Sequence, residues 1–143
     1  MQIIKNKQII DNHWTYLSDD APVIAGNISV SLNRWKQEKT QLVAREGNLG
    51  VRISPADDVT DLVADLSQLA LVELDFSDFA DGRSFSQAYL LRNRYDYQGE
   101  IRALGSYLAD QAFYLSRVGV NAFSAVNLPQ TQATLNDFTV FYQ

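Results

Sequence analysis

The sequence contains no cysteine and only one histidine, His13. The absence of cysteine excludes disulfide bonds, thiolate nucleophiles, and zinc or iron–sulfur centres held by thiolates. A single histidine near the N-terminus is too few for a histidine-rich metal site, and it disfavours a histidine-centred triad elsewhere in the chain. We therefore predict no metal site and no cysteine chemistry.

Long apolar runs are missing as well. No stretch approaches the roughly 18 apolar residues of a membrane-spanning helix. The N-terminal stretch MQIIKNKQIIDNHW lacks the basic start and apolar middle of a secretory signal. The net charge is −5, whereas a nucleic-acid-binding face needs an excess of basic residues. These features predict a cytoplasmic protein that has neither a membrane nor a nucleic acid as its partner.

Lysine is absent from most of the chain. All lysines lie within the first 39 residues, and arginine supplies every basic side chain after them. Four arginines fall within 20 residues, namely Arg83, Arg92, Arg94 and Arg102. Arginine forms planar, bidentate hydrogen bonds with carboxylates and oxyanions. The cluster therefore indicates either internal ion pairs with nearby aspartates, which is the commoner case, or a ligand site.

The residues that are present suffice for one domain over 1–143, since 46% of them are hydrophobic. Isoleucine pairs around a polar turn predict an N-terminal β-hairpin within residues 1–17. From 28 to 143, repeating strand–helix units are predicted from short apolar runs that alternate with helix formers. The predicted strands are 28–32, 49–55, 70–76, 99–105 and 121–126. The predicted helices are 33–48, 56–69, 84–95, 107–119 and 131–143.

This alternation predicts an α/β fold with a single open, mostly parallel sheet and helices on both faces. Five such units are too few for a closed eight-stranded barrel, so a Rossmann-like sheet and a half-barrel both stay open as architectures. In the helix predicted at 56–69, apolar side chains are expected to share one face. They are Val59, Leu62, Val63, Leu66 and Leu69.

The loop after the predicted strand 70–76 is the strongest candidate for a site, because ligands of parallel α/β sheets lie outside the carboxyl ends of the strands. Asp81-Gly82 predicts a tight turn, and Ser84 with Gln87 matches a capping box that starts a helix. A turn followed by a helix start explains this pattern without any ligand. Alternatively, Arg83 and the free N–H groups of the helix start form an anion site. The anion-binding candidates are Asp81, Gly82, Arg83, Ser84, Ser86, Ser106 and Gln111.

Arg102 is expected to have a structural role instead. It lies in GEIRALG, where Ile101 and Ala103 should face one side of the sheet and Arg102 the other. A buried guanidinium needs a fixed partner. We predict that Arg102 pairs with Glu73 or Asp75 on the preceding strand, if the two strands are neighbours.

Nucleotide-binding signatures are missing. No G-x-G-x-x-G follows a predicted strand, and no G-x-x-x-x-G-K-[ST] occurs. The absence of both motifs disfavours an enzyme that binds a dinucleotide cofactor. The residues identify neither a catalytic group nor a cofactor.

The stretch from residue 75 to 119, DFSDFADGRSFSQAYLLRNRYDYQGEIRALG followed by DQAFYLSRVG, resembles a bacterial family catalogued as domain of unknown function 934. The matching positions are Asp81, Gly82, Arg83, Phe85, Ser86, Ala88, Leu91, Arg92, Arg94, Gly99, Glu100, Arg102, Ala103, Gly105, Asp110, Gln111, Arg117 and Gly119. Ser84 departs from the pattern, where glycine is expected, and so does Val120-Asn121, where an aromatic residue and aspartate are usual.

The family is usually encoded beside genes for assimilatory sulfite reductase and sulfate assimilation, so the resemblance implies a role in that pathway. Members of the family are often described as oxidoreductases of sulfite reduction. The resemblance establishes no catalytic residue. Sulfite reduction moves electrons through haem and iron–sulfur centres held by cysteine, which this chain lacks. We therefore expect an accessory protein that binds an oxyanion, sulfite reductase or another sulfur-assimilation protein. A small cofactor-dependent oxidoreductase and a structural or interaction protein without a small ligand are the alternatives.

Overall fold

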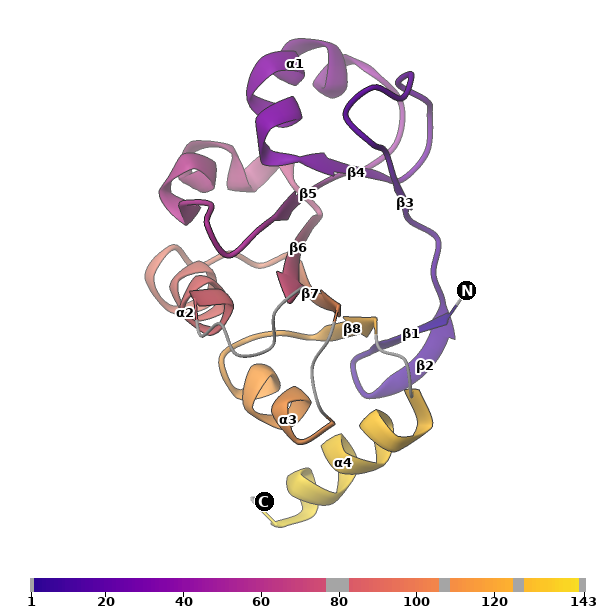
Figure 1. The fold of residues 1–143 in the computed structure, drawn as a ribbon, viewed down its shortest axis with the longest axis vertical. Helices are drawn as coiled ribbons and strands as arrows, with labels where there is room; N and C mark the ends of the chain where they lie inside the picture. Colours follow the sequence, from indigo (N-terminus) through magenta and orange to yellow (C-terminus); the bar gives the residue numbers. More distant parts are fainter. Residues whose placement is uncertain (1, 77–82, 106–108, 125–127, 142–143) are drawn as a thin grey trace.

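The computed structural model describes residues 2–76, 83–105, 109–124 and 128–141. Within them the chain forms an eight-stranded sheet with the strand order β2-β1-β8-β7-β6-β5-β4-β3. Figure 1 shows that the sheet curls into an open half-barrel. The strands are β1 Gln2–Lys5, β2 Gln8–Asp11, β3 Thr15–Tyr16, β4 Ile28–Ser31, β5 Leu49–Ile53, β6 Leu71–Phe76, β7 Glu100–Gly105 and β8 Ala122–Ser124.

Helices follow most of these strands on the outside of the curl (Figure 1). α1 begins directly after β4, and its N-cap Ser31 accepts a hydrogen bond from the backbone N–H of Arg34 at 3.1 Å. The α2 helix passes without a break into the π-helical turn η2. The helices are α1 Leu32–Ala44, η1 Val59–Gln68, α2 Arg83–Tyr89, η2 Leu90–Arg94, α3 Ala109–Arg117 and α4 Leu128–Phe141.

The sheet is mixed, which corrects the prediction of a mostly parallel sheet. Strands β3 to β8 pair in parallel, but β1 pairs antiparallel both with β2 and with β8. The N-terminal hairpin is therefore built into the sheet beside the last strand. Ile4 favours this position, because it pairs with Phe123 of β8 and is buried with it in the hydrophobic core.

The predicted helices on both faces are also corrected, since the helices in the described part of the chain lie on the convex face (Figure 1). Side chains of that face, such as Val30, Val51 and Leu74, join helix residues such as Trp35 and Leu62 in one hydrophobic core. The other, concave face carries charged side chains. These are Arg52, Glu73, Glu100 and Arg102, of which all but Arg52 are buried.

The N-terminal segment closes this concave side. β2 ends at Asp11 and β3 begins at Thr15, yet the two strands are the opposite edges of the sheet. Residues 12–14 can span at most about 14 Å between them, so the edges lie close together. We call residues 12–14 the strap. Figure 1 shows it on the side of the curl opposite α2 and α3.

The segment predicted as a helix at 56–69 forms a 3₁₀-helix over Val59–Gln68 instead. Its tighter turn places residues three apart on one face, so Asp65 follows Val59 and Leu62 into the interior. Val63 was expected on the buried face and is 38% exposed. Asp65 is stabilised there by Trp35, whose indole N–H donates to its carboxylate at 3.0 Å, and by Lys39 at 2.7 Å.

Candidate functional site

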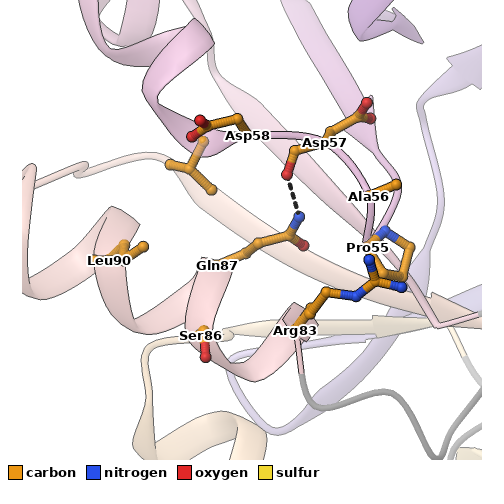
Figure 2. Close-up of a pocket in the computed structure, with 9 residues that line it drawn as sticks. Pro55, Ala56, Asp57, Asp58, Arg83, Ser86, Gln87 and Leu90 are labelled. Atoms are coloured by element: carbon orange, nitrogen blue, oxygen red, sulfur yellow. Dashed lines mark hydrogen bonds between the residues drawn. The ribbon is translucent and has the colours of Figure 1, made fainter.

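A groove lies where the loop after β5 faces the start of α2, at the carboxyl edge of the parallel strands. Figure 2 shows the Gln87 amide reaching across the groove to the loop. Its N–H₂ group donates to the carbonyl oxygens of Ser54 at 2.9 Å and Asp57 at 3.0 Å, which fixes the helix against the loop. The groove is lined by Pro55, Ala56, Asp57, Asp58, Val59, Arg83, Ser86, Gln87 and Leu90.

The structure brings together part of the predicted anion site. Arg83 and Ser86 are exposed and line the groove. Ser84 faces inward, and its hydroxyl is buried without a hydrogen-bond partner among the described residues. Gln111 lies half-buried on α3 and is not among the residues that line the groove. The predicted positions Asp81, Gly82 and Ser106 lie outside the described residues.

The two aspartates of the groove have structural functions. The Asp57 carboxylate accepts a hydrogen bond from the backbone N–H of Ser54 at 2.8 Å. Asp58 caps η1 by accepting from the backbone N–H of Thr60 at 2.9 Å, and its hydrogen bonds with Thr60 lower the pKa of its carboxyl. The groove thus combines one arginine with two acidic neighbours.

A second polar cluster occupies the concave face. Arg52, Glu73 and Arg102 are direct neighbours across β5, β6 and β7. Arg102 does not pair with Glu73, although the register places them opposite each other. It pairs with Glu100 on its own strand at 2.7 Å, and Glu100 also binds Lys5 at 3.1 Å.

Glu73 has Arg52 as its partner. Both contacts of the Arg52 guanidinium to the Glu73 carboxylate are 3.3 Å long. Asp75, the other predicted partner of Arg102, lies two residues further along β6 and makes no hydrogen bond or ion pair within the described part of the chain. The strap joins this network, because Arg102 donates to the Asn12 side-chain oxygen at 3.0 Å.

Burial falls along these strands toward their carboxyl ends. Glu73 is 3% exposed, whereas Asp75 beyond it is half-buried. The side chain of Arg52 is 28% exposed, and Tyr16 on β3 is 38% exposed. Within the described residues, charged side chains line the interior of the half-barrel and become more exposed toward the carboxyl ends of β5 and β6. We call this end the mouth.

Tyr16 covers Arg52 at the mouth. The guanidinium carbon lies 3.7 Å from the centre of the tyrosine ring, which is a stacking arrangement that arginine favours. Burial raises the pKa of the Tyr16 hydroxyl, Arg52 lowers it, and the carboxylates of Asp19, Glu73 and Asp75 raise it further. The net pKa is raised, so the hydroxyl stays protonated at physiological pH.

Sequence reasoning missed Tyr16, Arg52, Lys5 and Asn12 as parts of one cluster. One local signal was available, because Arg52, Glu73 and Arg102 each interrupt an apolar strand at its middle. Charges at that position indicate a polar interior face. Nothing local indicated that residues near the N-terminus would lie beside strands about 90 positions later, as Asn12 and Arg102 do.

Several residues of the 75–119 stretch hold the fold together. Arg92 donates to the carbonyl oxygens of Gly119 at 2.8 Å and Tyr97 at 2.6 Å. The Tyr97 hydroxyl donates to the carbonyl oxygen of Leu69 at 2.9 Å. Gly119 has a φ of +111°, and a Cβ there would overlap the Arg92 side chain. Arg92 on η2 and Gly119 just after α3 therefore form one packing unit.

These features define an α/β protein that gathers polar side chains at the carboxyl end of a curled sheet. The chain belongs to the family described as bacterial protein of unknown function (DUF934), whose model matches residues 50–143. This confirms the resemblance carried by residues 75–119. A comparison with curated proteins gave no match. None of the helices in the described part of the chain is long and apolar enough to cross a membrane.

Proposed function

We propose that this protein is an accessory component of sulfite reduction or sulfate assimilation that binds an oxyanion in the groove beside α2. The observation that supports this role is that Arg83 and Ser86, both exposed, line the same groove at the carboxyl edge of the sheet. An arginine fork and a hydroxyl are donors suited to the oxygens of sulfite, sulfate or a phosphorylated metabolite. The cellular context rests on the family resemblance.

The groove also favours one kind of oxyanion. The Gln87 amide oxygen is buried and has no hydrogen-bond partner among the described residues, and Asp57 and Asp58 add negative charge. An acceptor and two carboxylates disfavour a fully ionised oxyanion and favour one that still carries a proton to donate. Hydrogensulfite and monoprotonated phosphate meet this condition better than sulfate.

Calorimetric titration with sulfite, phosphate and sulfate at several pH values tests the groove. We expect Arg83→Ala to weaken oxyanion binding by about one to two decades, because it removes a charge-assisted bond worth roughly 1.5–3 kcal/mol. Arg94→Ala is the matched control, since it removes an exposed arginine from η2, away from the groove. Unchanged affinity in a folded Arg83→Ala protein would contradict this site.

Sulfite reductase itself is a second candidate ligand, and an apolar groove beside the first supports it. Phe85, Tyr89, Leu90 and Val118 line that groove together with Ser86. Tyr89 is 54% exposed, and exposed tyrosines are enriched at protein interfaces. A partner that covers Tyr89 would also lie beside the oxyanion groove, since Ser86 lines both grooves.

Co-purification of the tagged full-length protein with sulfite reductase tests this candidate. We expect Tyr89→Ala to reduce recovery of the reductase, whereas Val43→Ala, which alters an exposed apolar residue on α1, should not. Failure to retain the reductase at several salt concentrations would exclude it as the partner. A thermal shift with nicotinamide or flavin compounds would instead favour a cofactor-dependent oxidoreductase.

A further inference from the structure

Four side chains at the mouth of the half-barrel form a cluster separate from the groove beside α2. They are Tyr16 on β3, Arg52 on β5, and Glu73 and Asp75 on β6. All four are carried by strands of one sheet, so the backbone holds their spacing rigidly. The mouth is at the carboxyl ends of the parallel strands, where barrels and open α/β sheets place their ligands.

Arg52 is held in place by Tyr16 and Glu73, but its guanidinium keeps a hydrogen-bond donor that no described residue uses. Tyr16 stacks on one face of its guanidinium at 3.7 Å, and Glu73 contacts two of its nitrogens, both at 3.3 Å. Charge-assisted bonds are typically shorter, about 2.7–2.9 Å. The Nη1 nitrogen of Arg52 donates to no residue in the described part of the chain. The side chain is still 28% exposed, so a ligand at the mouth can reach it.

Asp75 provides the opposite charge. It lies on the same face as Glu73, because the two are separated by two positions on β6. Glu73 is opposite Arg52 in the register, which makes Asp75 the diagonal neighbour of Arg52. Asp75 is half-buried and has no ion pair or hydrogen bond among the described residues. A partly buried carboxylate without a donor is costly, and a ligand that supplies one would be favoured.

The charges of the cluster decide which ligands fit. By formal charge, Arg52 contributes +1 and Glu73 and Asp75 contribute −1 each, so the four side chains sum to −1. A bare oxyanion is disfavoured by this balance, and a bare cation is disfavoured by Arg52. A small molecule that carries a negative and a positive group close together can pair with both Arg52 and Asp75.

We propose that the mouth binds a small zwitterion of the amino-acid type, with its carboxylate on Arg52 and its ammonium group on Asp75. Tyr16 forms an aromatic wall beside the carboxylate, and its protonated hydroxyl is an additional donor. Glu73 is a positioning residue that orients the guanidinium from below. This site differs from the proposed oxyanion groove in its residues and in the net charge of its ligand.

The test begins with a thermal-shift screen of the full-length protein against the proteinogenic L-amino acids, each at about 10 mM, which is ten times a millimolar Kd. We expect at least one to raise the melting temperature. Its analogues that lack only the amino group or only the carboxylate should raise it far less. A screen in which no amino acid shifts the protein overturns the proposal, and so does equal binding of the two analogues.

Two variants locate the site. Asp75→Asn preserves shape and removes the charge, and we expect it to weaken the zwitterion's affinity roughly ten- to hundred-fold in calorimetry. Asp96→Asn, at an exposed position outside the mouth, is the matched control and should leave the affinity unchanged. Sulfite binding in the groove should be unaffected by Asp75→Asn, which keeps the two sites distinguishable. Unchanged zwitterion affinity in Asp75→Asn would place the ligand elsewhere and overturn the assignment.

Discussion

Arg102 lies in the middle of β7 with 2% of its surface exposed, and its guanidinium is fully used. It contacts Glu100 through two nitrogens, at 2.9 and 2.7 Å, and Asn12 through the third. Removing one member of a buried pair leaves the other charge without compensation, which costs about 3–5 kcal/mol. Lys5 would still contact Glu100, but Lys5 is 40% exposed and screened by water.

We therefore expect Arg102→Ala to lower the free energy of unfolding by about 3–5 kcal/mol in urea titrations. Arg94→Ala removes an exposed arginine and should change it by no more than about 0.5 kcal/mol. Arg83→Ala, also at an exposed position, should resemble Arg94→Ala in stability. Equal losses for Arg102→Ala and Arg94→Ala would show that Arg102 is not a structural residue.

Tyr97 makes stability depend on alkaline pH. Burial raises the pKa of its hydroxyl, Arg92 nearby lowers it, and Glu100 raises it, with a large net increase. In the unfolded chain tyrosine ionises near pH 10. Above that pH the folded protein keeps the Tyr97 proton that the unfolded chain loses. The contribution of Tyr97 to the free energy of unfolding is therefore fully present below about pH 10 and decreases as the pH rises.

The free energy of unfolding should therefore fall between about pH 9 and about pH 11, and it should fall less in Tyr97→Phe. The other tyrosines and the lysines contribute equally to both proteins, so the difference isolates Tyr97. At neutral pH, Tyr97→Phe also loses the hydrogen bond to Leu69, worth about 0.5–1.5 kcal/mol. An identical alkaline loss in the two proteins would contradict the raised pKa.

At the scale of elements, Gly119 lies in the turn between α3 and β8 and packs against Arg92, which donates to its carbonyl oxygen. Gly119→Ala places a methyl group into the Arg92 side chain and also forces alanine to a φ of +111°. Gly26→Ala is a matched control, because Gly26 has a φ of +100° but nothing within 4 Å of the added Cβ. Both variants carry backbone strain of about 1–2 kcal/mol, and Gly119→Ala should lose about 1–3 kcal/mol more by overpacking. Thermal unfolding gives the difference, and equal losses would contradict the packing unit.

The strap is the element that couples the N-terminus to the sheet. The Asn12 side-chain oxygen accepts from the backbone N–H of Trp14 at 3.0 Å and from Arg102 at 3.0 Å. Beyond it, β3 is held by hydrogen bonds from Thr15 to Asn27 and from Leu17 to Ser29. Loss of Asn12 should therefore loosen β3 without opening the core.

In Asn12→Ala we expect faster amide hydrogen exchange at Thr15 and Leu17 and unchanged exchange in β6. Asn93→Ala alters an exposed asparagine on η2 and should leave β3 as protected as in the parent protein. Exchange measured by mass spectrometry on peptides covering residues 12–17 distinguishes these outcomes. If β3 exchanges equally in both variants, the strap is held by something other than Asn12.

At the scale of the whole molecule, the family match and the folding unit differ in extent. The match begins at residue 50, but strand β1 pairs with β8 and β4 pairs with β5. Residues before the match also fill the core, including Ile4, Val30, Trp35 and Leu42, all with no exposed surface. A fragment of residues 50–143 would expose β5 and β8 as unpaired edges and leave their core incomplete.

We expect the 50–143 fragment to show no cooperative thermal transition by circular dichroism, whereas the full chain unfolds cooperatively. Addition of a peptide covering residues 1–49 should partly restore the transition, because it supplies the missing strands. A fragment that unfolds cooperatively by itself would mean that the N-terminal strands are dispensable for the fold.

The alternation of strands and helices from residue 28 onward was evident in the sequence, because apolar periodicity is a local property. The hairpin was also evident, since a short polar turn between isoleucine pairs requires no distant partner. Arg83 and Ser86 were expected at one helix start, and both lie on α2 and line the groove. The buried position of Ser84 and the exposed position of Val63 were not expected, because the direction of a side chain depends on the exact helical turn and on what packs against it.

What the sequence by itself determined about this protein is therefore its class of elements, its lack of cysteine, and its family. Only the tertiary structure decided that β1 lies beside β8, that Arg102 pairs with Glu100 and not with Glu73, and that Tyr16 meets Arg52 at the mouth. These outcomes depend on how far the sheet curls and on which edge each strand joins. These long-range pairings depend on the burial of the whole core. No single residue contributes enough to that burial for its partner to be predicted from the sequence.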